Sequence, residues 1–358
     1  MTYLRVFSMF VVFWCVSQAG KAVAQDWIYH AQPGDTLWDL CIEHTARRGC
    51  FKELASYNNM TEQNRVYPGD EIRIPIAWLV ALPIVGKVVN VQGEVYYQPQ
   101  SGANVIPLRE GQNLVLGGSI SCKSGSARIT LGNHSEMLIR RDSVLELSNM
   151  SVGNSQGQAA ELQLNKGEVE VKVKPNSRSR FEIHTPSAIA AVRGTKYRVV
   201  SQAGTRSEVL SGKVAVQAET EVDVPAGFGV KAQKGKVLGD LRKLLDAPIF
   251  AEPSVQSTLP IHVHWLGNPG AIAWQLDLYA EGEAGALLIS THSTTPEIQY
   301  QQLAQGCYRL VARGIDEDGF NGLESQLPVC VHAPAPEPEP ETNWALILWL
   351  AMAALILI

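Results

Sequence analysis

The sequence lacks an excess of positive charge: 30 lysine and arginine residues stand against 35 aspartate and glutamate residues, a net charge of -5. Proteins that bind the phosphates of nucleic acid usually carry a basic field, so we expect no nucleic-acid partner. Charged residues make up only 18% of the 358 residues, whereas 46% are apolar. This length and composition predict two to three domains with sizeable cores.

The sequence also lacks a combination of residues that would support catalysis. Gly153–Gly157 matches the nucleophile-elbow pattern, but it lies in a polar stretch without a strand-to-helix context. His262 and His264 share one face of a predicted strand, with no third metal ligand at a suitable spacing. Asp316 and Asp318 lack the twelfth-position glutamate of a calcium loop, and no phosphate-binding glycine loop occurs. We therefore expect a non-enzymatic protein without a cofactor or metal.

The N-terminal end of the chain carries the features of a secretory signal. Arg5 precedes an apolar run from Val6 to Val16, and Ala22-Val23-Ala24 is the small-x-small pattern that a signal peptidase cleaves. We expect residues 1–24 to be a signal peptide and Gln25 to be the mature N-terminus. A lipoprotein signal is disfavoured, because Phe13-Trp14-Cys15 lacks the small or aliphatic residues that precede a lipidated cysteine.

The C-terminal end is hydrophobic and follows a tract that alternates proline with glutamate. Residues 334–342 form this spacer, and Glu341 is its last charged residue. Residues 343–358 contain no charged side chain. Fifteen residues of helix span about 22 Å, which is short against a hydrocarbon core of about 30 Å. We favour a transmembrane anchor over a buried core helix, because the spacer separates the segment from any domain, and a removable sorting tail is the alternative.

Cysteine is scarce: of six cysteines one, Cys15, belongs to the signal, which leaves five. Cys307 and Cys330 flank the turn sequence DEDG symmetrically, as a cross-strand pair in a hairpin would. Cys41 and Cys50 are also close enough in sequence to pair, which leaves Cys122 alone. Disulfides fit an exported chain, but the sequence does not fix their connectivity.

Two long blocks alternate apolar and polar residues with glycines between them. In residues 85–232, stretches such as "SARITLG" and "TKYRVVS" predict an all-β domain. The stretch "GDLRKLLDAPIF" predicts a short helix in a linker over residues 233–258. Residues 259–333 again contain six short strand patterns, which suggest a β-sandwich. The expected fold class is multidomain and mainly β.

Residues 26–76 have a different pattern, with a strand, two short helices and a closing strand. In "QPGDTLWDL", Gly34 supplies a turn, and Asp35 or Thr36 can cap a helix that begins near Leu37. A helix start leaves backbone N–H groups without partners inside the helix, and a ligand can accept from them. The segment "YPGDEIRIP" then closes the region with a turn and a strand.

These segments, together with "LASYNNM", resemble the LysM family. The resemblance implies a βααβ fold and binding of peptidoglycan or a chitooligosaccharide-like glycan in a groove between the first turn and the loop after the second helix. The insert "CIEHTARRGC" is longer than the family's usual helix connection. The residues that the resemblance places at the glycan are Gly34, Asp35, Thr36, Leu37, Asn58, Asn59 and Met60.

The stretch "HTPSAIAAVRGTKYRVV", residues 184–200, breaks the alternation of the middle block and reads as an irregular crossing between strands. Its Thr185-Pro186 and Val192-Arg193-Gly194-Thr195 resemble the FecR domain family, which implies an extracytoplasmic β-domain with a protein partner. Arg193 can contact that partner or be a buried charge that holds the turn. Members of the family relay signals to sigma factors through a cytoplasmic segment, which a cleaved signal would not leave here.

The last block resembles a fibronectin type III-like sandwich through "HVHWLGNPGAIAWQLDLYA" and "LAQGCYRLVARGIDEDGFNGLES". Together these features predict an exported protein at the periplasmic face of the cell envelope, anchored at its C-terminus. It would bind peptidoglycan through the LysM-like region, with an unknown protein partner for the FecR-like region. The alternatives are a FecR-type signalling regulator and an accessory subunit of a cell-wall hydrolase.

Overall fold

The computed structural model describes residues 26–60, 65–132, 134–150, 159–174, 180–192, 194–282 and 285–333. The predicted signal peptide, the Pro-rich spacer, the predicted transmembrane anchor, Gly153–Gly157 and Arg193 lie outside these ranges. Within them, no helix is both long enough and apolar enough to cross a membrane. The chain divides into two compact units, residues 1–82 and 83–358, and each is described by itself.

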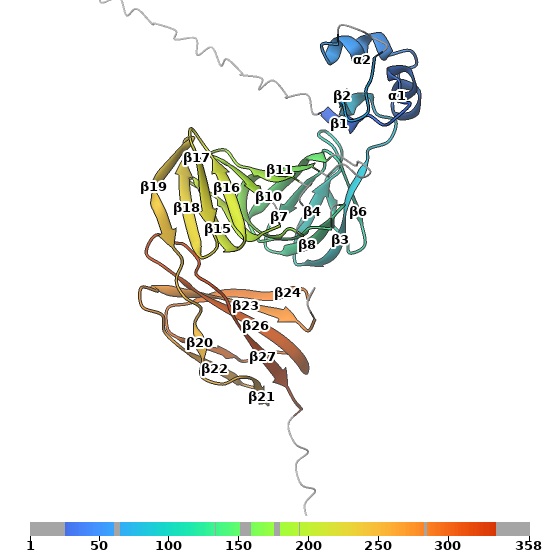
Figure 1. Ribbon diagram of the computed structural model, residues 1–358. Coiled ribbons are helices and arrows are strands. Elements are labelled where there is room, and N and C mark those ends of the chain that lie inside the picture. Colours follow the sequence, from blue (N-terminus) through green and yellow to red (C-terminus); the bar gives the residue numbers. More distant parts are fainter. Residues whose placement is uncertain are drawn as a thin grey trace, which may run out of the picture. The chain divides into compact units, whose positions relative to one another are not determined.

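The first unit has the order strand, helix, helix, strand (Figure 1). Its hydrophobic residues follow the periods of these elements: Leu37, Leu40 and Cys41 line one face of a helix, and Ile72 and Ile74 alternate along a strand. The two strands pair antiparallel. The elements are β1 (Asp26–His30), α1 (Leu37–His44), α2 (Phe51–Tyr57), β2 (Glu71–Pro75) and a short 3-10 helix, η1 (Ile76–Trp78).

The second unit begins with two long ladders of hydrogen-bonded strands that share β11 (Ala159–Lys172). The last six residues of β11 pair with strands of ladder one, and its first part pairs with strands of ladder two. Alternating residues such as Val169 and Val171 are buried, as the sequence pattern requires.

Ladder one contains, in spatial order around β11, β6 (Asn113–Val115), β3 (Ile84–Gln92), β8 (Ser126–Leu131), β9 (Glu136–Ile139), β14 (Lys196–Ser201), β15 (Thr205–Ser211), β18 (Phe228–Gln233) and β19 (Lys236–Lys243). Ladder two contains β5 (Ile106–Pro107), β4 (Val95–Gln98), β7 (Ser119–Cys122), β10 (Ser143–Met150), β12 (Arg180–His184), β13 (Ile189–Val192), β16 (Lys213–Gln217) and β17 (Glu221–Pro225).

The remainder of the second unit is a sandwich of a three-stranded and a five-stranded sheet. Trp265, Trp274 and Leu310 belong to the core between them. The first sheet has the order β20 (Ile249–Phe250), β22 (Ile261–Leu266), β25 (Glu297–Tyr300). The second has the order β21 (Val255–Ser257), β27 (Ser325–Val331), β26 (Gly306–Ile315), β23 (Ala273–Ala280), β24 (Leu287–Ser293).

Two expectations about local structure are wrong. The predicted short helix in residues 233–258 is absent: residues 236–243 form β19, which pairs with β18, and residues 249–250 form the short strand β20. The leucines at helical spacing misled the prediction, because pairing along a sheet edge overrides a weak local propensity. The stretch after Pro186 is also more regular than expected, since β13 follows the turn and pairs with β12 and β16.

A cluster of buried charges joins ladder one to the sandwich. Asp277 of β23 is fully buried and accepts hydrogen bonds from Arg140, at the end of β9, and from Arg313 of β26. Beside it, Glu208 of β15 accepts from Arg198 at 2.6 Å and from the backbone of Asn321 at 2.8 Å. Buried charged groups therefore hold the sandwich and ladder one together.

Candidate functional site

The first unit contains two turns of the same construction, Gln32–Asp35 and Tyr67–Asp70. In each turn the aspartate side chain accepts from the backbone N–H three residues earlier, at 2.6 Å in the first and 2.8 Å in the second. Gly34 and Gly69 both have φ of +97°, a left-handed conformation that favours glycine. The repeated letters PGD thus encode one turn geometry twice.

The two turns lie at the same end of the unit. The backbone N–H of Ala31 donates to the carbonyl of Asp70 at 2.9 Å, and the N–H of Gly69 donates to the carbonyl of Ala31 at 2.8 Å. The Asp35 carboxylate also accepts from the Tyr29 hydroxyl at 2.8 Å. Burial, and then this hydrogen bond to Asp35, raise the pKa of Tyr29, so the phenol stays neutral and holds the first turn against β1.

Thr36 is the N-cap of α1, which settles the choice between Asp35 and Thr36. Its Oγ1 accepts from the backbone N–H of Asp39 at 3.1 Å and donates to the Asp39 carboxylate at 2.6 Å. The first two N–H groups of the helix, on Leu37 and Trp38, have no carbonyl partner within the helix. Capping therefore fixes the direction in which these donors point.

Leu37 does not offer its side chain to a ligand. It is only 1% exposed, and Leu40 and Leu54 are buried in the core as well. Because the Leu37 side chain is buried, its backbone N–H is the part of this residue that lies at the turn.

Asn58, Asn59 and Met60 follow α2, but they have different roles. The Asn58 amide clamps β2: its Oδ1 accepts from the N–H of Arg73 at 2.7 Å, and its Nδ2 donates to the Arg73 carbonyl at 2.9 Å. Asn59 is exposed in a left-handed conformation, φ 55°, and its amide makes no hydrogen bond within the described residues. Met60 is half-buried, and its N–H donates to Ala55. Asn59 is thus the side chain of this loop with unused hydrogen-bonding capacity.

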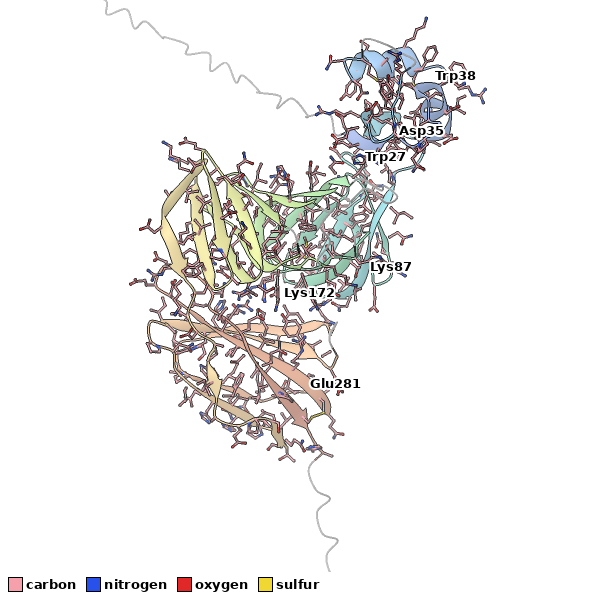
Figure 2. The ribbon with its side chains drawn as sticks, viewed as in Figure 1. Trp27, Asp35, Trp38, Lys87, Lys172 and Glu281 are labelled. Atoms are coloured by element: carbon pink, nitrogen blue, oxygen red, sulfur yellow. A yellow bond between two sulfur atoms is a disulfide. The ribbon has the colours of Figure 1, made fainter. Side chains whose placement is uncertain are left out.

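The first unit has exposed aromatic side chains that are not among the predicted site residues, and Trp38 and Tyr67 are the most exposed of them. Trp38, directly after the first turn, is 51% exposed and lies 5.3 Å from the ring of Phe51. Figure 2 shows it pointing outward from α1. Tyr67, in the second turn, is 56% exposed. A large aromatic ring that is exposed is an informative departure from ordinary burial. Trp38 lies within the sequence QPGDTLWDL, so this signal was present in the motif.

The insert between the helices is closed by a disulfide. Cys41 and Cys50 are bonded with a Cα–Cα distance of 5.7 Å, and Thr45 is buried beside them with its hydroxyl 3.6 Å from the Cys50 sulfur. A second disulfide joins Cys307 to Cys330 across β26 and β27, while Cys122 is buried and free. The insert joins the C-terminal end of α1 to the start of α2, about 12 Å along α1 from Thr36. The insert therefore lies at the C-terminal end of α1 and the N-terminal end of α2, whereas Thr36 and Asn58 lie at the other ends of these helices.

Comparisons with known protein families give two matches. The model described as LysM domain matches residues 29–75, and the model described as FecR protein matches residues 120–215. The order of the two domains is the one that the sequence analysis gave. A comparison with curated proteins finds no match to this chain.

Among solved structures, the chain is similar to a proposed anti-sigma factor from Parabacteroides distasonis ATCC 8503, with 18% identity and a TM-score of 0.31; the match covers 35% of this chain and 60% of that chain. The match thus spans less than two thirds of the length of that chain. A second likeness is to the extracellular domain of a proposed one-component system from B. thetaiotaomicron, with 8% identity and a TM-score of 0.18, over 70% of this chain and 57% of that one.

A third likeness is to the FN1-FN3 domains of chicken CNTN1, with 11% identity and a TM-score of 0.21, over 71% of this chain and 96% of that chain. These scores and identities are too low to carry an argument about function.

Proposed function

We propose that this chain, which carries a LysM domain at residues 29–75 followed by a FecR domain, is a non-enzymatic envelope protein that binds peptidoglycan. The LysM domain holds the N-acetylglucosamine glycan, and the FecR and fibronectin type III-like domains form a scaffold for a protein partner. The glycan site consists of Gly34, Asp35, Thr36, the backbone of Leu37, Asn59 and Met60.

The chemistry of an N-acetyl group supports this site. The acetamide has one carbonyl acceptor, one N–H donor and one methyl group. The N–H groups at the start of α1 can donate to the carbonyl, the free Asn59 amide can accept from the N–H, and half-buried Met60 offers an apolar contact to the methyl. Trp38 adds an exposed ring against which a sugar face can pack.

The observation that carries the proposal is that, among the described residues, the exposed Asn59 amide and the first N–H groups of α1 have no hydrogen-bond partner, whereas the Asp35, Asp70 and Asn58 side chains do. Leaving such groups on rigid elements is what a preorganised binding site requires. Asn58 is excluded from the site because its amide is committed to β2.

Sedimentation with purified peptidoglycan tests the proposal. The full chain should pellet with peptidoglycan, and Trp38→Ala and Thr36→Ala should each leave more protein in the supernatant. Thr36→Ser keeps the capping oxygen and should pellet like the unmodified chain. Failure of the unmodified chain to pellet would remove the glycan-binding function, whereas unchanged pelleting of both alanine variants would remove only the site.

The FecR match also favours a second candidate, a signalling regulator that acts through a protein partner. Determining the mature N-terminus decides between the two, because a regulator of this kind needs a cytoplasmic segment before a membrane span. A third candidate function is that of an accessory subunit of a cell-wall hydrolase. It predicts more clearing in a zymogram when the chain is added to a hydrolase than with the hydrolase alone. Export and C-terminal anchoring belong to the proposal and are tested by fractionation of the cell envelope.

A further inference from the structure

A polar cleft of about 950 Å³ lies where ladder one of the FecR domain meets the sandwich. On the FecR side, turns containing Gly93, Gly125 and Gly167 line the cleft. Glycine is needed where the first two turns meet, because a Cβ on Gly93 would lie 2.9 Å from the Cα of Gly125. On the sandwich side, strand β24 contributes the largest group of lining residues, and Gln275, Ile315, Gly319 and Asn321 complete the wall.

The cleft runs along a free sheet edge. Four consecutive residues of β24, Leu287–Ser290, line it together with His292. Successive side chains of a strand point to opposite faces, so a wall that includes consecutive residues is the backbone edge of the strand. Within the described residues β24 pairs with β23 and with no other strand. An unpaired strand edge can accept an additional strand from another chain.

The rim of the cleft carries positive charge that the domain does not use. Arg141 and Lys166 are exposed, and neither forms an ion pair within the described residues. By contrast, Arg140 and Arg206 in the same cleft are paired with buried carboxylates. Asp142 also lines the cleft, so Arg141, Lys166 and Asp142 together carry a net charge of +1. The positive charge of Arg141 also acts on His292: the pKa of this histidine is lowered first by burial and then by Arg141.

The β24 wall is held in place before any ligand arrives. Ser290 donates to Asp277 at 2.8 Å, and Arg140 donates to Ser290 at 3.4 Å. Leu287 packs with Leu138 of the FecR domain in a small apolar cluster. A strand edge fixed in this way loses little conformational entropy when a segment pairs with it.

From these observations we infer that the cleft docks an extended acidic segment of a partner protein, which pairs with the free edge of β24 and places carboxylates against Arg141 and Lys166. The inference rests on the scaffold role proposed above and names the chemistry of the partner. It does not depend on the glycan site.

A binding measurement with synthetic peptides of the seven-residue length of β24 tests the inference. The full chain is titrated with a fluorescent peptide of alternating glutamate and valine, with its lysine counterpart, and with a glutamate peptide whose backbone amides are N-methylated. The expected result is binding of the first peptide alone. The double variant Arg141→Glu/Lys166→Glu should weaken this binding at least about tenfold, since two attractive charges become repulsive.

The matched control is Lys213→Glu/Lys236→Glu, which reverses two exposed lysines outside the cleft and should bind like the unmodified chain. Equal binding of the lysine peptide, or an unchanged affinity in the cleft variant, would overturn the inference. Equal binding of the N-methylated peptide would overturn the pairing with β24. Peptidoglycan sedimentation of the same cleft variant should be normal, which separates a failure here from a failure of the glycan-binding proposal.

Discussion

The LysM domain and the junction between the FecR domain and the sandwich are stabilised in opposite ways. In the LysM domain, the turns are built from hydrogen bonds between residues three apart, and a disulfide spans nine residues. At the junction, Arg140 and Asp277 are 137 residues apart, and Glu208 and Asn321 are 113 apart. The first region is therefore encoded by short motifs, and the second only by the completed fold.

The junction should be the more fragile of the two regions towards a single substitution. Asp277→Ala removes the shared partner of Arg140 and Arg313 and leaves two buried guanidinium groups with less compensation. We expect the free energy of unfolding of the second unit to fall by about 3 to 5 kcal/mol. Urea denaturation followed by intrinsic fluorescence measures the loss.

Asp223→Ala is the matched control, because it breaks the exposed ion pair with Lys213 and should cost at most about 1 kcal/mol. Similar losses of unfolding free energy in the two aspartate variants would show that the buried cluster stabilises the fold no more than an exposed ion pair does.

The covalent link should dominate in the LysM domain. Replacing both Cys41 and Cys50 with alanine removes the loop constraint from the unfolded chain and should destabilise that domain by about 2 to 4 kcal/mol. Hydrogen exchange resolves the two units separately, so faster exchange is expected in α1 and α2 and not in the FecR domain. Uniform acceleration across the chain would contradict the independence of the two units.

Acid should weaken the junction between ladder one and the sandwich. Burial alone would raise the pKa of Glu170, but Lys196 and Arg140, together with Arg313 and Arg198, outweigh burial and lower it to about 2 from an ordinary value of 4.5. A carboxyl with a lowered folded pKa stabilises the fold above its unfolded pKa, and this contribution is lost as pH falls towards the folded value. The melting temperature of the second unit should therefore drop between about pH 4.5 and pH 2.

The variant Lys196→Met sharpens this prediction. Without the Lys196 ammonium, the pKa of Glu170 rises, and the loss of stability should begin at a higher pH than in the unmodified chain. Identical pH profiles would mean that Glu170 does not govern the transition.

The contrast between the regions also explains what could be read from the sequence. The PGD turns, the Thr36 cap and the strands of alternating residues are local, so residue type and spacing predict them well. Strands β22 and β23 both lie in the block of residues 259–333 whose alternation predicts strands. The same reasoning identified Asn59 without distinguishing it from Asn58, because the clamp on Arg73 depends on a contact 15 residues away.

The sequence could not reveal the junction or the cleft. Arg140 stands beside Arg141 and Asp142, and Arg198 and Arg313 lie in strands. Nothing in the local sequence marks these three arginines as buried partners of distant carboxylates. The β24 edge is likewise a property of sheet order and not of the stretch "ALLIST". The prediction of a helix near Leu241 is wrong for a related reason, because pairing with β18 makes this stretch a strand despite its helical spacing of leucines.

The smallest effect concerns the cap of α1. Thr36→Ala should destabilise the LysM domain by about 1 kcal/mol, because the N–H of Asp39 loses its acceptor. Thr36→Ser should restore most of this loss. The measurement is the thermal unfolding of the LysM domain, and an equal loss in both variants would indicate that the threonine methyl group, and not the cap, contributes the stability.

The central claim is that the LysM domain binds glycan through the loop that contains Asn59, and the affinity for a chitooligosaccharide tests it most directly. Asn59→Gly removes the free amide and keeps a residue that adopts the positive φ of this position. Arg48→Ala, in the exposed insert, is the control. The account predicts weaker binding for Asn59→Gly alone, measured by isothermal titration of the full chain. Equal affinities for Asn59→Gly and the unmodified chain would contradict it.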